Sequence, residues 1–277
     1  MLVVIGVGGM GLAIARRRGS GTTVLLADAD EVVLRANADR LASEGHDVIV
    51  QPVDVSSRQA VASLAHQASA LGPVTQLVHT AGLSPAQATS EAILRVDLIG
   101  VAFTLEEFGQ VIAAGGAGVV IASMAGTFLA GVLTAEQELA LACTTTDELP
   151  RLPLLSSDMI GDPGMTYALA KRANQLRVQA ASVTWGERGG RVNSISPGII
   201  STPMGRLELA SATGEIMRTM TQASAMGRLG TPDDIASAAA FLLGDDASFI
   251  TGTDLLVDGG VVAGQRFSPG HAPVAGP

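Results

Sequence analysis

The chain has 277 residues, which is enough for one large α/β domain or two small ones. Apolar residues make up 47% of it and charged residues only 16%, so disorder over most of the chain is excluded, because disorder requires low hydrophobicity and high charge. The formal net charge of −9, one cysteine and four scattered histidines argue against a nucleic-acid or anionic-lipid surface, a disulfide framework and a structural metal site.

Short β-branched runs alternate with longer helical patterns, which predicts a doubly wound parallel sheet in one domain, residues 1–264. Strands are expected at Leu2–Ile5, Thr23–Ala27, Asp47–Pro52, Gln76–Thr80, Val119–Ala122, Arg191–Ile195 and Asp254–Val257. Helices are expected at Gly9–Arg18, Asp30–Ser43, Ser57–Leu71, Ile93–Ala113, Tyr167–Trp185 and Pro232–Leu243. Ser56 is the expected cap of the third helix, and Gln265–Pro277, rich in Gly and Pro, is expected to form a flexible tail.

The apolar segment Leu2–Ile5 is interpreted as a buried strand and not as a signal peptide, because no basic residue precedes it and glycines follow at once. The chain contains no run of about 18 apolar residues, so we expect no membrane span. These two observations predict a cytoplasmic protein.

The first strand leads into Gly6-Val7-Gly8-Gly9-Met10-Gly11 and then into a helix, which is the context of a dinucleotide-binding loop. Gly6 allows a tight turn, Gly8 lets the backbone approach a pyrophosphate, and Gly11 permits close packing of the helix on the strand. The N-terminus of the helix offers free N–H groups to phosphates. Glycines also serve ordinary turns, but this context favours a nucleotide site contacted by Gly6, Gly8, Gly9, Met10 and Gly11.

Two aspartates follow predicted strands and are candidates for cofactor binding. Asp28 lies 22 residues after Gly6, where an acidic side chain can hold a ribose 2′-hydroxyl; the alternative is a solvated helix cap. No Arg or Lys follows Asp28 until Arg35, so a 2′-phosphate has no evident cationic partner and NAD is favoured over NADP. Asp54 either accepts a hydrogen bond from an adenine amine or is an ordinary residue at the start of the next helix.

The only tyrosine, Tyr167, and the only lysine, Lys171, stand four residues apart on a predicted helix and therefore share a face. A nearby ammonium lowers the pKa of a phenol, which lets it exchange a proton with an alcohol or carbonyl oxygen. Ser123 ends the fifth strand, at the sheet edge where such folds bind ligands, and its hydroxyl can donate to the same oxygen. The alternatives are a surface helical pair and a serine that only terminates a strand.

On these residues the chain resembles the short-chain dehydrogenases/reductases from Leu2 to about Val262. The matching pieces are the glycine loop, Asp28, Asp54-Val55, Ala81-Gly82, Ser123, Tyr167/Lys171, the segment Arg191–Gly198, Thr202, Arg228–Pro232 and Asp258-Gly259-Gly260. The resemblance implies a seven-stranded Rossmann-type fold with helices on both faces, and NAD(P)-dependent interconversion of alcohols and carbonyls. It implies catalysis by Ser123, Tyr167 and Lys171. The residues that it implies for cofactor binding are Val55, Thr80, Ala81, Gly82, Tyr167, Lys171, Pro197, Gly198, and, for the nicotinamide carboxamide, Ile200 and Thr202.

The chain departs from the family pattern at several points. The glycine loop is one residue shorter, and His79-Thr80-Ala81-Gly82 replaces the usual Asn-Asn-Ala-Gly. Asp97 aligns with the helix asparagine of the catalytic tetrad, where we expect it to be compatible with catalysis. Ser123 and Tyr167 are 44 residues apart, which leaves an insertion of about 30 residues within 127–163, before the catalytic helix. In this insertion and in the altered motif before Ala81-Gly82, the chain resembles the 3α-hydroxysteroid dehydrogenase/carbonyl reductase branch of the family.

The insertion contains an amphipathic stretch that ends at Cys143, with Thr134 as its expected N-cap, and a second short helix is expected from Thr146. Its two ends lie at the predicted active site, so we expect a helical cap over the substrate cleft or a subunit interface; the alternative is a surface excursion. We expect a homodimer or a homotetramer.

The residues together predict an NAD-dependent oxidoreductase that interconverts a secondary alcohol and a ketone, with steroid-like or other hydrophobic small molecules as candidate substrates. One alternative is a nucleotide-binding regulator that has lost turnover, for which Asp97 is the only support. A second is an S-adenosylmethionine-dependent methyltransferase, in which Tyr167 and Lys171 would have no role. No nucleic-acid, membrane or metal partner is expected.

Overall fold

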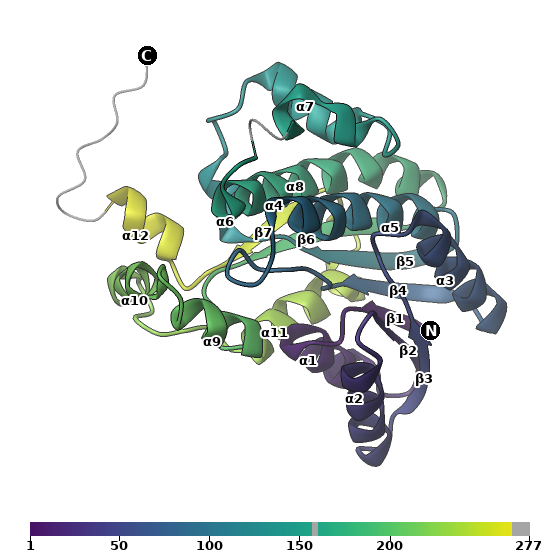
Figure 1. Cartoon of the computed structure of the whole chain (residues 1–277). Coiled ribbons are helices and arrows are strands. Elements are labelled where there is room, and N and C mark those ends of the chain that lie inside the picture. The colour runs from purple at the N-terminus through teal and green to yellow at the C-terminus, as the bar shows by residue number, and fades with distance from the viewer. Residues whose placement is uncertain (157–159, 268–277) are drawn as a thin grey trace.

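Seven parallel strands form one sheet in the order β3-β2-β1-β4-β5-β6-β7 (Figure 1). The computed structural model describes residues 1–156 and 160–267. The strands are β1 (Leu2–Ile5), β2 (Thr23–Asp28), β3 (Asp47–Pro52), β4 (Val74–His79), β5 (Ile112–Ile121), β6 (Arg191–Pro197) and β7 (Asp254–Val257). The strand order reverses between β1 and β4, and a crevice at such a switch point is where open α/β sheets bind ligands. The predicted Rossmann-type fold is confirmed.

Helices cover both faces of the sheet. On one face lie α1 (Gly9–Arg18), α2 (Glu31–Ser43) and α11 (Pro232–Leu243). On the other lie α3 (Arg58–Leu71), α5 (Gly100–Gly109) and α8 (Pro163–Glu187). The strands separate two apolar cores: Leu2 and Val4 of β1 enter the first, whereas Val3 and Ile5 enter the second, as the alternation of a strand dictates. A sheet buried on both faces explains the high apolar content.

Several predicted element bounds are wrong. The helix expected at Ile93–Ala113 consists of α4 (Ser90–Ile93), a π-helical turn over Leu94–Ile99 and α5, and Ala113 already belongs to β5. Strand β5 begins at Ile112 because it pairs there with Val74 of β4, ahead of a register shift. Two further helices, α9 (Pro203–Leu209) and α10 (Gly214–Ala223), were not predicted.

Two expectations at element ends also need correction. The N-cap of α3 is Ser57, whose hydroxyl accepts from the N–H of Ala60, while Ser56 bonds to Asp54. Helix α12 (Val261–Phe267) includes the first three residues of the expected tail, 265–277; residues 268–277 lie outside the described residues. In α11, by contrast, the cap at Thr231 is a complete capping box with Asp234.

The insertion packs on the outer side of α8 (Figure 1, teal ribbon). It begins in the last residues of α6 (Met124–Phe128) and contains α7 (Ala135–Cys143) and two 3₁₀ turns, Leu149–Arg151 and Pro153–Leu155. Thr134 caps α7 as predicted, with Gln137 completing a capping box. Buried leucines of the insertion join residues of α8 in a third apolar cluster, so this segment is a folded layer of the domain.

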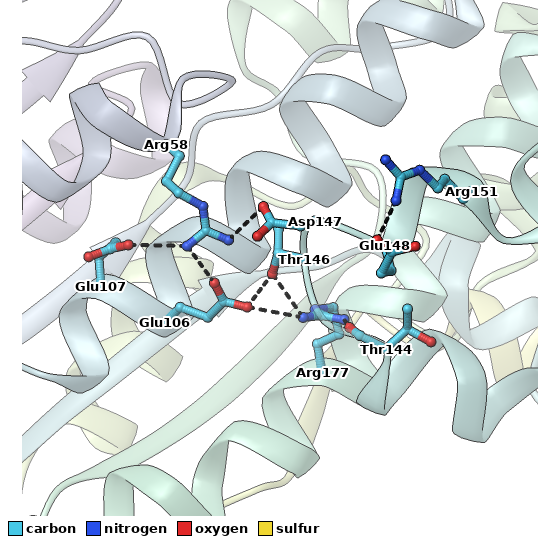
Figure 2. A network of polar contacts seen from close by, with 9 residues as sticks. All are labelled: Arg58, Glu106, Glu107, Thr144, Thr146, Asp147, Glu148, Arg151 and Arg177. Atoms are coloured by element: carbon cyan, nitrogen blue, oxygen red, sulfur yellow. Dashed lines mark hydrogen bonds and ion pairs between the residues drawn. The ribbon is translucent and has the colours of Figure 1, made fainter.

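Polar contacts fasten the insertion to three helices (Figure 2). Asp147 of the insertion pairs with Arg58 of α3 at 3.3 Å, and the Thr146 hydroxyl donates to Glu106 of α5, which itself pairs with Arg58 at 3.0 Å. Arg177 of α8 donates to the carbonyl oxygen of Thr144 at 2.9 Å. Arg177 is buried, and buried backbone carbonyls need hydrogen-bond donors, so its guanidinium stabilises this part of the insertion.

Candidate active site

The glycine loop is fitted tightly between β1 and α1. Gly6 has a φ of +89°, and a Cβ added there would lie 2.3 Å from the backbone nitrogen of Ala81. A Cβ on Gly11 would lie 2.0 Å from the carbonyl oxygen of Gly6. Around Gly8, the N-cap of α1, an added Cβ would meet nothing within 4 Å. The loop therefore leaves open space beside the free N–H groups of a helix N-terminus, as a pyrophosphate requires.

One cavity of about 290 Å³ lies at the carboxyl edge of the sheet. It brings together residues that are far apart in sequence, from the glycine loop to the segment after β6. The predicted site residues that line it are Gly8, Gly9, Met10, Thr80, Gly82, Asp97, Ser123, Tyr167, Lys171, Pro197, Gly198, Ile200 and Thr202. The glycine loop and the predicted reactive residues thus share one cavity.

The other predicted cofactor residues do not line this cavity: they are Gly6, Gly11, Asp28, Asp54, Val55 and Ala81. Asp28 touches the glycine loop, since one carboxylate oxygen accepts from the N–H of Val7 at 2.8 Å. The cap of α2 is Asp30 and not Asp28, so the capping alternative does not apply to Asp28. Asp54 accepts from the N–H and the hydroxyl of Ser56, which matches its local, structural alternative.

Four predicted catalytic side chains converge on the cavity. The Lys171 ammonium lies 3.0 Å from a carboxylate oxygen of Asp97 and 5.3 Å from the centre of the Tyr167 ring. It also donates to the carbonyl oxygen of Ile121, at the end of β5, at 3.3 Å. Ser123 follows that strand and its hydroxyl accepts from the N–H of Ala125 at the start of α6. Asp97 and the carbonyl oxygen of Ile121 therefore fix the position of the Lys171 ammonium, while Tyr167 and Ser123 line the cavity.

Asp97 owes its position to the π-helical turn and to a glycine opposite it. Its side chain is fully buried and accepts from the N–H of Leu83 at 2.8 Å. A Cβ on Gly82 would lie 2.9 Å from an Asp97 carboxylate oxygen and 3.4 Å from the Lys171 nitrogen. Gly82 thus leaves the space that the ion pair needs. Burial raises the pKa of Asp97, and the Lys171 ammonium and the Leu83 N–H act against that rise.

The expected net lowering of the Tyr167 pKa is not found. Burial raises the pKa of the phenol, Lys171 lowers it, Asp97 raises it and Ser123 lowers it, with a net rise. The lysine acts in the predicted direction, but desolvation and the aspartate charge outweigh it. Burial by itself would lower the pKa of Lys171, yet the charges of Asp97 and Tyr167 overcome this and raise it.

His79, which replaces the first family asparagine, does not line the cavity. It is fully buried at the end of β4. Burial, followed by the nearby Lys171 charge, lowers its pKa to about 3. The imidazole is therefore neutral at physiological pH and adds no charge beside the lysine.

Several cavity residues were not named individually from the sequence: Leu83, Gln87, Ile121, Ala122, Pro203, Met204, Gly205, Leu207 and Glu208. Five of them belong to the undetected helix α9. The signal for that helix was present, because Thr202 precedes Pro203, and a threonine followed by proline is typical of a helix start. The Thr202 hydroxyl indeed accepts from the N–H of Gly205 at 3.0 Å.

The insertion does not contribute to the walls of the cavity. Among its described residues, 127–156 and 160–163, none lines the cavity, and α7 lies on α8 instead. This placement does not support the expected cap over the substrate cleft. The other expectation, a subunit interface, stays a prediction.

Within residues 1–156 and 160–267, no three His, Cys, Asp or Glu side chains gather as ligands for a metal ion. No helix in the described part of the chain is both long enough and apolar enough to cross a membrane.

Two family models and several known proteins are similar to this chain. A family model described as short chain dehydrogenase matches residues 1–135, and one described as Enoyl-(Acyl carrier protein) reductase matches residues 153–262. The chain is 44% identical to a short-chain dehydrogenase/reductase of Alternaria brassicicola, over 95% of both proteins. It is 31% identical to the galactitol 2-dehydrogenase (L-tagatose-forming) of Cereibacter sphaeroides, over 91% of this chain and 90% of that protein. A short-chain type dehydrogenase/reductase from Mycobacterium ulcerans has a similar structure, with a TM-score of 0.73, 25% identity and coverage of 95% of this chain and 89% of that one.

Proposed function

Because the chain belongs to the short-chain dehydrogenase/reductase family, we propose that it is an NAD-dependent oxidoreductase that interconverts a secondary alcohol and a ketone. The observation that carries the proposal is the meeting of Ser123, Tyr167 and Lys171 with the glycine loop in one cavity. A methyltransferase would have no use for this triad. Asp97, the only support for an inactive regulator, pairs with Lys171 and leaves the phenol and the serine on the cavity, which favours turnover.

The protein's part in the reaction is to orient the substrate oxygen and to move its proton. Ser123 donates a hydrogen bond to that oxygen, and the Tyr167 phenol exchanges a proton with it. The Lys171 ammonium favours the phenolate form of Tyr167 and is compact enough to reach ribose hydroxyls as well. When NAD is bound, its nicotinamide ring supplies the hydride chemistry.

The residues present fit NAD. The N–H groups at the start of α1 face the open space beside Gly8, where a pyrophosphate would bind. Ile200 and Thr202 line the cavity at the position proposed for the nicotinamide carboxamide. Asp28 lies against the loop and would accept from a ribose hydroxyl, which supports NAD over NADP.

The substrate is proposed to be a small molecule with a largely apolar skeleton, and steroid-like compounds remain candidates. Leu83, Met204 and Leu207 supply apolar wall to the cavity that Tyr167 lines. The name of the Cereibacter relative shows that a polyol is oxidised within this family. We also propose a cytoplasmic homodimer or homotetramer.

A panel of secondary alcohols and ketones, steroids included, tests the proposal through the absorbance change of NAD(H). We expect turnover of at least one class of compound. Binding of NADH, seen by its fluorescence, without turnover anywhere on the panel would favour the inactive regulator. Failure to bind NADH at all would refute both.

A further inference from the structure

The cavity contains a second carboxylate besides Asp97, and this one does not pair with Lys171. Glu208 lies near the end of α9 and lines the same cavity as Tyr167 and Ser123. It is half-buried, and its carboxylate makes no hydrogen bond or ion pair with any residue in the described part of the chain. Asp97, by contrast, has both an ammonium and an N–H as partners.

This position is unfavourable for a carboxylate in the isolated protein. Burial raises the pKa of Glu208, because the charged form loses hydration and gains no cation in return. The side chain also lies in the last turn of α9, where the unpaired carbonyl groups of a helix carry partial negative charge. No residue in the described ranges offsets these costs, which points to a group that arrives with the substrate.

We propose that Glu208 accepts a hydrogen bond from a second hydroxyl of the substrate, so that the enzyme prefers diols or polyols to simple secondary alcohols. The inference rests on the proposed function, because Tyr167 and Ser123 mark where the reacting hydroxyl binds. Apolar wall from Leu83 and Leu207 lies in the same cavity and suits the carbon skeleton between the two hydroxyls. A hydroxyl fits this subsite better than an ammonium, because a charged group entering apolar wall loses more hydration.

Glu208 also influences the catalytic phenol. The groups that act on the Tyr167 pKa are Lys171 and Ser123, which lower it, and Asp97 and Glu208, which raise it in addition to burial. Removal of the Glu208 charge is therefore expected to lower the pKa of Tyr167. The acidic limb of the pH–rate profile for alcohol oxidation then moves to lower pH, a shift that a purely structural residue would not cause.

The test compares cyclohexane-1,4-diol with cyclohexanol in the wild-type enzyme, Glu208→Leu and Glu208→Gln. The matched control is Glu215→Gln, which changes an exposed carboxylate of α10 that pairs with Arg218. We expect the wild-type kcat/KM to favour the diol by about tenfold to a hundredfold, the range for a hydrogen bond to a charged group. Glu208→Leu is expected to lose this preference because its KM for the diol rises. The control variant Glu215→Gln is expected to keep the preference.

Glu208→Gln keeps an acceptor oxygen without the charge, so it is expected to retain part of the preference and to show the pH shift. Because glutamine has nearly the same shape as glutamate, Glu208→Gln keeps the test valid if Glu208→Leu fails to fold. An unchanged diol preference in both variants would overturn the proposal. So would a wild-type enzyme that favours 4-aminocyclohexanol over the diol, which would assign the subsite to an ammonium.

Calorimetric titration of the NADH complex with the same compounds measures binding without turnover. It therefore tests the Glu208 subsite separately from the proposed oxidoreductase function. If no alcohol is oxidised but the diol binds more tightly than cyclohexanol in the wild type and not in Glu208→Leu, the subsite stands and the proposed function fails. If cyclohexanol is oxidised and both compounds bind and react equally well, the function stands and the subsite is refuted.

Discussion

At the scale of single residues, the phenol of Tyr167 is the group whose loss should stop the reaction. Tyr167→Phe removes the proton donor and acceptor but leaves the glycine loop and Lys171 in place. A positioned acid–base group contributes about 10²- to 10⁴-fold in rate, so kcat is expected to fall by that factor. NADH binding, followed by fluorescence, is expected to persist. A variant with the wild-type kcat would contradict the role of Tyr167.

Asp97 tunes the same phenol through its charge. Burial raises the pKa of Tyr167 and the Asp97 carboxylate adds to this rise, so Asp97→Asn is expected to lower that pKa. The reacting form in alcohol oxidation is the phenolate, which exists above the pKa. The acidic limb of the pH–kcat profile should therefore move to lower pH. Asp246→Asn, an exposed carboxylate outside the cavity, is the control that should leave the profile in place.

Asp28 is expected to set the cofactor preference. Its carboxylate lies against the glycine loop, and a 2′-phosphate placed there would meet a like charge. Such contacts cost several kcal/mol, which corresponds to at least about a hundredfold in kcat/KM for NAD over NADP. Asp28→Asn should reduce the ratio of kcat/KM for NAD to kcat/KM for NADP. Equal use of both cofactors by the wild type would show that Asp28 does not contact the ribose.

At the scale of elements, the hydrogen bonds from Arg177 to the insertion should contribute more to stability than to catalysis. Its guanidinium donates to the carbonyl oxygens of Leu141 and Thr144 and to the hydroxyl of Thr146. Arg177→Leu leaves the two carbonyl oxygens without this donor, at about 1–3 kcal/mol for each that stays buried, whereas the Thr146 hydroxyl keeps its bond to Glu106. We expect a clear fall in the free energy of unfolding, measured by denaturant titration.

The matched control is Arg151→Leu. Arg151 lies in the same segment, and its one ion pair within the described residues is with Glu148, on the exposed surface (Figure 2). Exposed pairs contribute little, so the unfolding midpoint should hardly move. Both variants should retain kcat/KM for small alcohols, because neither residue lines the cavity. A loss of activity without a loss of stability in Arg177→Leu would mean that the insertion shapes the site.

At the scale of the whole molecule, the insertion covers apolar surface that would otherwise face solvent or another copy of the chain. It packs on Leu169, Ala173 and Leu176 of α8. Replacing residues 130–161 with a Gly-Ser linker is expected to expose this face and to raise the oligomer mass measured by light scattering. KM should change little and NADH binding should persist. An unchanged mass would argue against any link between the insertion and assembly.

The sequence by itself was enough for the features that depend on neighbouring residues. The alternation of apolar runs with helical patterns predicted the doubly wound parallel sheet, and the glycine spacing predicted the loop between β1 and α1. The offset of four residues placed Tyr167 and Lys171 on one helix face, because a helix repeats its faces at that interval.

Features that depend on long-range contacts were decided only by the tertiary structure. The start of β5 at Ile112 follows from pairing with Val74, and no local signal marks it. The net rise of the Tyr167 pKa follows from burial and from Asp97, which lies 70 positions away in the chain. Glu208 reaches the cavity only because α9 folds back over it, and the insertion lies on α8 because its leucines find an apolar face there. Local patterns specify elements, whereas burial and charge at a site arise from segments that meet only when the chain has folded.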